Sequence, residues 1–175
     1  NSEKDEFYPS LTKNGDLYFT VEADYGKGKE DIVMCGYKND AYERPVSLPE
    51  AINSTGYEFN AFVDPDGKYI LFTGYGRKDD LGRGDLYISR KDLNGNWLTA
   101  EHLPEGINSV VLVYFPFVSW DKKILFFTSE KNGLKKSFEG EPVKIEELVK
   151  LFTSPQNGGG DIYWVSLEAL LKSLK

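Results

Sequence analysis

An internal repeat limits what this chain can fold into more than any other feature of its sequence. The tripeptide Ile-Asn-Ser occurs at 52–54 and again at 107–109, and the pair Asn-Ser also stands at 1–2. Each copy continues with a turn-forming pair, a hydrophobic run that ends in Phe-Thr, and an Asp followed by an aliphatic residue. Self-similarity of this kind predicts a fold in which copies of one supersecondary unit stack on each other.

The landmarks keep their register in all three copies. Counting from each Asn, the ninth residue is Pro9, Ala61 or Pro116. The fourteenth and fifteenth residues are Asn14-Gly15, Asp66-Gly67 and Asp121-Lys122. The hydrophobic runs are LYFT (17–20), YILFT (69–73) and ILFFT (124–128), and the Asp landmarks are Asp31, Asp85 and Asp161.

Each copy is predicted to form four short antiparallel strands. In the second copy the strands are expected at 57–63, 69–75, 85–91 and 97–103, with Asp-Gly and Asn-Gly turns at 64–68 and 92–96. Four such strands per copy describe a β-propeller blade, whose sheet has to pack on neighbouring sheets. The prediction is an all-β, single-domain chain (1–175) with blade 1 at about 1–52, blade 2 at about 53–107 and blade 3 at about 108–166.

These motifs resemble the TolB-type, WD40-like β-propeller repeat family of bacterial envelope proteins. The resemblance rests on the repeated pattern N-S…E-F…D-G-K…L-F-T…G-x-G-D-I-Y…W and on the ending GGGDIYWVSLEALLKSL, and it spans nearly the whole chain outside 134–157. It implies a periplasmic or secreted protein. It also implies rings of six or more blades, so that three blades amount to half a ring.

The third copy departs from the other two. It carries an insertion at 134–157, in which apolar residues at helical spacing predict a short helix near 141–152. That helix is interpreted either as a lid or docking surface, or as an ornament packed on the adjoining blade. After the strand at 161–166 no fourth strand is predicted, because Leu167, Leu170, Leu171 and Leu174 form the stripe of a C-terminal helix (167–174).

Two open faces and an unpaired strand edge follow from this arrangement, and such surfaces favour association. The chain is therefore expected to be the C-terminal part of a longer propeller, with a missing N-terminal half, or to complete its ring with a second chain. Two copies making six blades is one form of the second alternative.

Blade geometry places the irregular connections 21–30, 49–56, 74–84, 104–111 and 129–160 on one rim. Because binding residues are common on loops held by a rigid scaffold, this rim is the predicted functional face. Aromatic and basic side chains there suit a glycan, a peptide or an anionic group. The candidate ligand-binding residues are Tyr25, Lys27, Lys29, Glu58, Tyr75, Arg77, Lys78 and Lys131.

Other repeat positions are interpreted as structural: Asn53, Asn108, Gly67, Asp31, Asp85 and Asp161. The three Asp residues are expected to accept hydrogen bonds from backbone N–H groups and so to fix the loops before the third strands. Asp161 belongs to the stretch GGGDIYW (158–164), which lacks the Lys and Ser or Thr of a phosphate-binding loop.

Composition narrows the function classes. The formal net charge of −7 argues against a nucleic-acid surface. A single cysteine, Cys35, and a single histidine, His102, make an internal disulfide impossible and a metal cluster or Ser-His-Asp triad improbable. The leading prediction is a non-enzymatic binding or scaffold module, without metal or cofactor, that binds a protein or glycan. The alternative is a carbohydrate-active enzyme, like a glycoside hydrolase or lyase, in which Glu6 and Glu58 act from the channel. A purely structural segment is a third possibility.

Overall fold

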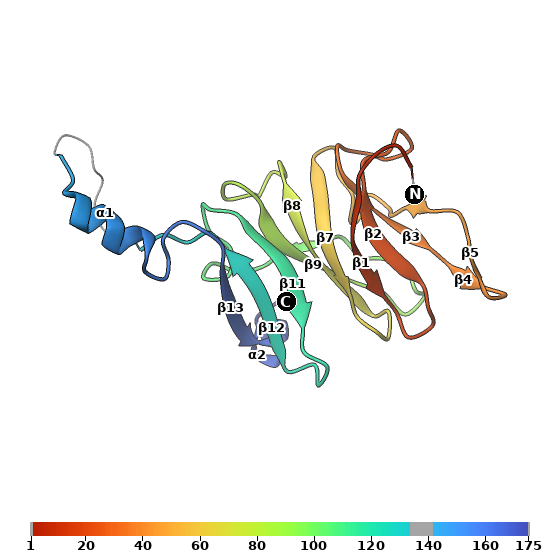
Figure 1. Cartoon of the computed structure of the whole chain (residues 1–175). Coiled ribbons are helices and arrows are strands. Elements are labelled where there is room, and N and C mark those ends of the chain that lie inside the picture. Colours follow the sequence, from red (N-terminus) through yellow and green to blue (C-terminus); the bar gives the residue numbers. More distant parts are fainter. Residues whose placement is uncertain (1, 134–141, 175) are drawn as a thin grey trace.

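The computed structural model describes residues 2–133 and 142–174 and consists mainly of three antiparallel sheets that stand side by side (Figure 1). The all-β expectation is confirmed, and the described residues do not close into a ring. The N-terminal sheet contains β1 (Glu6–Leu11), β2 (Leu17–Val21), β3 (Asp31–Cys35) and β6 (Val46–Ser47). The central sheet contains β7 (Tyr57–Val63), β8 (Tyr69–Tyr75), β9 (Asp85–Arg90) and β10 (Glu101–His102). The C-terminal sheet contains β11 (Val113–Val118), β12 (Ile124–Ser129) and β13 (Asp161–Ser166).

Two helices and one hairpin complete the described structure. Helix α1 (Ile145–Phe152) lies in the connection between β12 and β13, and α2 (Leu167–Ser173) follows β13 directly. Both helices were expected, although 134–141 of the predicted insertion lie outside the described residues. The hairpin of β4 (Tyr37–Lys38) and β5 (Ala41–Tyr42) was not predicted, because its turn is Asn39-Asp40 and not an Asn-Gly or Asp-Gly pair. Both turn residues have positive φ, as a two-residue primed turn requires.

The first strands of the three sheets, β1, β7 and β11, share one irregularity. Each pairs with the next strand through a register shift, and the shift falls at the same repeat position in all three sheets. Tyr8, Asn60 and Phe115 occupy that position with φ of 55°, 55° and 53°. A bulge of this kind increases the local twist of a strand. Because the same bulge recurs in β1, β7 and β11, the first strands of the three sheets are structurally equivalent.

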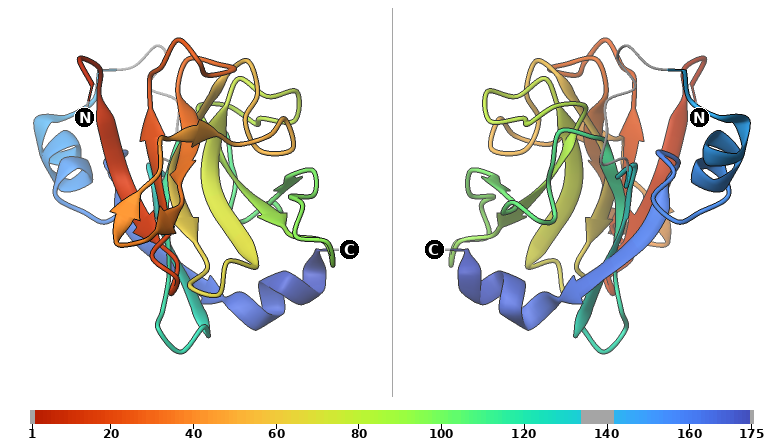
Figure 2. Two further views of the ribbon diagram at one scale, coloured as in Figure 1. Left: turned by 90° about the vertical axis from the view of Figure 1, so that its right-hand side faces the viewer. Right: turned by 90° about the vertical axis from the view of Figure 1, so that its left-hand side faces the viewer.

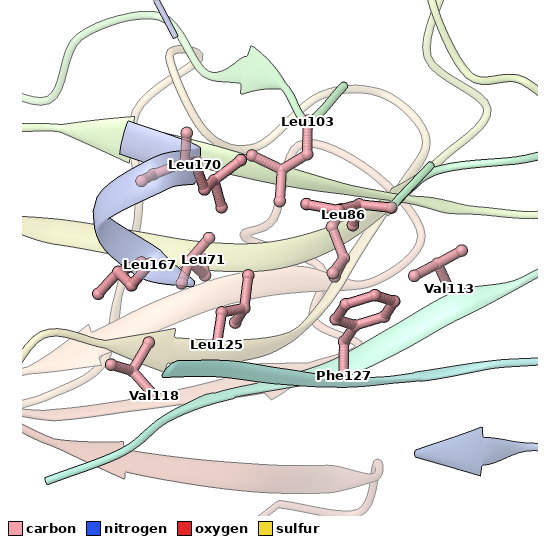
Figure 3. Packing of buried hydrophobic residues seen from close by; sticks show 11 residues of the cluster. Leu71, Leu86, Leu103, Val113, Val118, Leu125, Phe127, Leu167 and Leu170 are labelled. Atoms are coloured by element: carbon pink, nitrogen blue, oxygen red, sulfur yellow. The ribbon is translucent and has the colours of Figure 1, made fainter. Parts of the chain in front are cut away.

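Two hydrophobic cores hold the sheets together. Between the N-terminal and central sheets, Tyr18 and Ile32 pack against Ile70, Phe72 and Tyr87. The core between the central and C-terminal sheets is closed from below by α2 (Figures 2 and 3). Figure 3 shows Leu167 and Leu170 of α2 directed toward Leu71, Leu103 and Leu125. Helix α2 therefore packs into the core directly after β13, in agreement with the expectation that a helix and not a fourth strand follows there.

Each core is bordered by one buried asparagine that joins two sheets, here called an asparagine bridge. The N–H of Ile32 donates to Asn53 Oδ1 (3.0 Å), and Asn53 Nδ2 donates back to the Ile32 carbonyl (2.8 Å) and to that of Leu48 (3.3 Å). Asn108 repeats this geometry one sheet later, with Leu86 (2.8 and 2.9 Å) and Leu103 (2.9 Å). The Asn of each Ile-Asn-Ser therefore binds the third strand of the preceding sheet.

The Asp landmarks stand directly before the residues that the asparagines bind. Asp31 accepts from the N–H groups of Lys27 (2.6 Å) and Gly28 (2.9 Å), and from the Ser47 hydroxyl (2.8 Å). Asp85 accepts from the Leu81 N–H (2.6 Å) and lies 2.9 Å from His102 Nε2. Because β6 and β10 pair in the same register, His102 is the counterpart of Ser47. The only histidine thus takes a structural position beside the asparagine bridge.

The first-to-second strand turns meet through charged side chains. Gly15 and Gly67 adopt a positive φ at this turn position, which favours glycine because glycine has no side chain. At the same position of the third copy, Lys122 adopts a positive φ of 57°. The Lys122 ammonium lies 2.6 Å from both Asp64 and Asp66 of the neighbouring turn. Lys122 and Lys13 together lower the pKa of Asp66 to about 2. The ion pairs offset the strain of a non-glycine residue at this position.

The predicted fourth strand at 97–103 is mostly wrong. Within it only Glu101–His102 form a strand, and Trp97 makes an isolated bridge with Lys91. Ser89 Oγ donates to the Leu98 carbonyl (2.5 Å) and takes the place of a ladder hydrogen bond there. An outer strand pairs with one neighbouring strand only, so an interruption of its pairing costs little stability.

Replacing Asn108 by Ala should lower the free energy of unfolding by about 2–4 kcal/mol, because it leaves buried backbone groups of Leu86 and Leu103 unpaired. Asn53→Ala should have an effect of similar size at the other bridge. The exposed turn variant Asn94→Ala is the matched control and should stay within about 0.5 kcal/mol of the original chain. Urea denaturation followed by circular dichroism measures all three, and an Asn108→Ala effect no larger than that of Asn94→Ala contradicts the bridge.

His102→Ser should be less destabilising than His102→Ala, by about 1 kcal/mol. The serine hydroxyl restores the contact that Ser47 makes to Asp31, whereas alanine leaves buried Asp85 with the Leu81 N–H alone. Thermal and urea unfolding of the two variants give the comparison. Equal stability of the Ser and Ala variants would show that His102 stabilises the chain through ring packing on Tyr87 instead.

Candidate functional site

The predicted rim is formed by the connections between second and third strands. These are 22–30 between β2 and β3, 76–84 between β8 and β9, and 130–160 between β12 and β13, of which 134–141 lie outside the described residues. In Figure 1 the first two connections lie at the same end of their sheets. The third carries α1 and is much the longest. The rim therefore differs from the opposite end of the sheets, where short turns join the strands.

Helix α1 stands clear of the sheets (Figure 1), and none of its residues is buried. Four of its five apolar residues lie on one side of the helix and are here called the α1 stripe: Ile145, Leu148, Val149 and Phe152. Ile145 is 74% exposed and Phe152 is 66% exposed. Glu147 and Lys150 lie on the opposite side, and the acidic first turn suits the positive end of the helix dipole. Among the described residues, the α1 stripe is therefore mainly exposed apolar surface.

Glu58 and Arg77 are the two predicted site residues that the structure brings together. Glu58 is fully buried at the start of β7, and Arg77 reaches it from the rim with Nη1 3.1 Å from Oε1. The same nitrogen donates to the Ile52 carbonyl (2.9 Å), and the guanidinium lies over the Tyr87 ring at 4.6 Å. Tyr87 in turn donates to Asp79 (2.9 Å). Arg77 is therefore enclosed as a structural ion-pair partner and does not offer a free cation to a ligand.

The buried carboxylate of Glu58 accepts three hydrogen bonds. It accepts from the Ser54 N–H (2.7 Å) and the Ser54 hydroxyl (2.5 Å) as well as from Arg77. Burial raises the pKa of Glu58, and the bonds from Ser54 and the charge of Arg77 partly oppose that rise. Glu58 is thus directed into the protein, and the expectation that it lines an open channel is wrong.

The same Ser–Glu contact recurs in the N-terminal sheet. There Glu6 accepts from the Ser2 N–H (2.8 Å) and from its hydroxyl, and these bonds lower the pKa of Glu6. In the C-terminal sheet Val113 replaces the acid, and the buried hydroxyl of Ser109 has no hydrogen-bond partner among the described residues. The acids of the enzyme alternative are therefore repeat positions that anchor the entry to a first strand.

The other predicted ligand-binding residues are spread along the rim. Tyr25 and Tyr75 are exposed, and Tyr75 packs its ring on Tyr57 at 5.6 Å. Lys131 donates to the Gly106 carbonyl (2.7 Å) and lies over the Tyr163 ring. Lys27, Lys29 and Lys78 have exposed side chains. These residues do not converge on one pocket.

A pocket that was not predicted from the sequence lies along the first strands of all three sheets. It has a volume of about 330 Å³ and is here called the first-strand pocket. Its apolar lining includes Tyr8, Phe62, Phe117 and Trp120, and Lys122 stands at its margin. Burial raises the pKa of Tyr8 to about 12, and its hydroxyl donates to the Pro116 carbonyl (3.1 Å). Aromatic residues occur near the ninth position of each copy, and this pattern is the sequence feature that could have indicated the pocket.

Glu58 and Glu6 should give opposite pH dependences although they share one repeat position. The pKa of Glu58 lies above the ordinary 4.5, so the folded state binds its proton more tightly than the unfolded chain. Its contribution to the free energy of unfolding therefore falls as pH rises from about 4.5 through the folded pKa. The pKa of Glu6 is lowered, so its contribution is present above 4.5 and is lost as pH falls.

Urea denaturation between pH 3 and pH 8 tests this on Glu58→Gln and Glu6→Gln. The stability difference between the original chain and Glu58→Gln should decrease with rising pH, and the corresponding difference for Glu6→Gln should increase. Two differences with the same slope would contradict the assignment of Glu58 as the enclosed acid.

Comparison with known proteins adds no family to these observations. No protein-family model matches the chain, and no curated protein matches it. Among the residues the structure describes, no helix is long and apolar enough to cross a membrane. The same residues contain no group of three or more His, Cys, Asp or Glu side chains placed to hold a metal ion.

Proposed function

We propose that the chain is a non-enzymatic binding and scaffold module of the β-propeller type, with each of its three sheets as one blade. Three antiparallel sheets with equivalent first strands and equivalent bulges, joined by two equivalent asparagine bridges, support this proposal. The resemblance to the TolB-type repeat supports it as well, and a bacterial envelope protein is part of what we propose. In this proposal the sheets provide a rigid support, and the rim engages the partner.

The partner is a protein, and α1 is the element that binds it. The single observation that carries this is the exposed α1 stripe, since a helix that buries none of its residues has no role in the core. Apolar residues at positions i, i+3, i+4 and i+7 are the spacing with which an amphipathic helix lies in an apolar groove. The exposed lysines and tyrosines of the other rim loops provide further polar surface for the partner.

Photo-crosslinking from α1 tests the proposal. A photoreactive phenylalanine at Val149, inside the stripe, should give one discrete protein adduct in extract of the organism that encodes the chain. The same group at Lys150, on the opposite side of α1, is the matched control and should give little adduct. Excess unlabelled chain should suppress the Val149 adduct, because it competes for the same groove.

Excess chain carrying Ile145→Ser and Phe152→Ser should compete at least 10-fold less well, since it lacks the outer two anchors of the stripe. Circular dichroism confirms that this variant keeps its sheets. Equal adduct from Val149 and Lys150, or equal competition by the Ser variant, would refute binding through the α1 stripe.

A further inference from the structure

The C-terminal sheet has one buried face and one exposed face. Leu125, Phe127, Tyr163 and Val165 belong to the core shared with the central sheet or pack against it. Phe126 and Trp164 form a directly opposed pair on the other face, as do Thr128 and Ile162. Ile162 is 77% exposed and Trp164 is 67% exposed. Phe126, Thr128, Ile162 and Trp164 are here called the C-terminal outer face.

The same repeat positions are covered in the other two sheets. Ile32, the counterpart of Ile162, is fully buried against the central sheet. Leu86 and Ile88, the counterparts of Ile162 and Trp164 in the central sheet, are fully buried against the C-terminal sheet. The C-terminal outer face is therefore the third copy of a surface that is an interface in both of its other occurrences.

Among the described residues, the Ile162 backbone groups and the Asp161 carboxylate of β13 lack the side-chain partners that the corresponding groups of β3 and β9 have. Ile162 pairs with Thr128 in the register that Ile32 has with Thr20 and Leu86 has with Thr73. Its N–H and carbonyl thus point to the strand edge, where no described residue forms an asparagine bridge with them. Asp161 accepts from the Gln156 N–H (2.7 Å), but no side chain within the described part of the chain takes the place of Ser47 or His102.

The opposite end of the chain offers the matching surface. On the side of the N-terminal sheet that faces away from the central sheet, Leu17, Phe19 and Cys35 line a pocket of about 540 Å³. Phe19 occupies the repeat position of Phe72 and Phe127, each of which packs in one of the two cores between sheets. Tyr25 and Tyr42 form further parts of the wall. We call this surface the N-terminal pocket.

We infer that the C-terminal outer face binds the N-terminal pocket of a second copy of this chain. Trp164 and Ile162 of one copy fill the apolar pocket of the other, in the arrangement that already joins the central sheet to its two neighbours.

The contact is head to tail, so it uses two different surfaces and closes only if the rotation between copies completes a ring. Two copies supply six sheets, which lies within the four to eight that propellers contain, whereas three copies would exceed it. The inference rests on the proposed propeller architecture. It is independent of α1, because neither surface includes a residue of that helix.

The mass of the purified chain is the first test. Light scattering after size exclusion at about 50 μM should give twice the 19.8 kDa of one chain. Ile162→Glu with Trp164→Glu, and separately Leu17→Glu with Phe19→Glu, should each raise the dissociation constant about 100-fold or more. Leu93→Glu with Leu98→Glu, on exposed positions of the connection between β9 and β10, is the matched control and should leave the dimer intact. If a Glu variant does not fold by circular dichroism, Trp164→Ala or Phe19→Ala replaces it.

Mixing the two monomeric variants distinguishes head-to-tail contact from every other dimer. The Leu17/Phe19 variant keeps an intact C-terminal outer face, and the Ile162/Trp164 variant keeps an intact N-terminal pocket. A mixture should therefore form a one-to-one dimer through a single contact. A monomeric original chain overturns the inference, as does a dimer that either variant leaves unchanged or a mixture that stays monomeric. Val149 crosslinking in the same variants should be unaffected, so that failure here leaves the proposed function testable on its own.

Discussion

Two buried asparagine side chains determine how the sheets of this chain fit together. An amide side chain offers a donor and an acceptor side by side, so it can bind both peptide groups of one residue at a strand edge. Asn53 and Asn108 do this for Ile32 and Leu86, at the border between a sheet and the next. Without the bridge, the cores on either side would be bordered by unpaired backbone groups. The packing of apolar residues and the pairing of polar groups therefore depend on each other.

Much of the fold could be predicted because the three copies of the repeat can be compared with one another. The strands at 57–63 and 69–75 were predicted with the bounds that the structure shows, since alternating apolar residues and Asp-Gly turns define them locally. The lack of a fourth strand after β13 and the presence of α2 could be read from the change in periodicity at Leu167. These features depend on short stretches of sequence and on their comparison across three copies.

The candidate site could be predicted less well, because it depends on contacts between copies. Glu58 and Arg77 were both predicted as ligand-binding residues of the rim, but the sequence did not indicate that they form an ion pair or that Ser54 and the Tyr87 ring enclose them. His102 looked like an isolated residue of an outer strand, and its equivalence to Ser47 appears only when the strands are paired. The hairpin of β4 and β5 was missed because Asn39-Asp40 is a weaker turn signal than Asn-Gly. Burial and partner choice are tertiary properties that periodicity does not encode.

The asparagine bridge also gives the chain a direction. Asn53 and Asn108 each bind the sheet before them in sequence, so the central and C-terminal units each carry the group that attaches them to the preceding sheet. A duplicated or deleted unit would meet a compatible neighbour on both sides, since Ile32 and Leu86 present the same two peptide groups. Such a chain can change its number of units during evolution without a new interface. In this respect the described units follow one another like the units of a linear polymer that has a head and a tail.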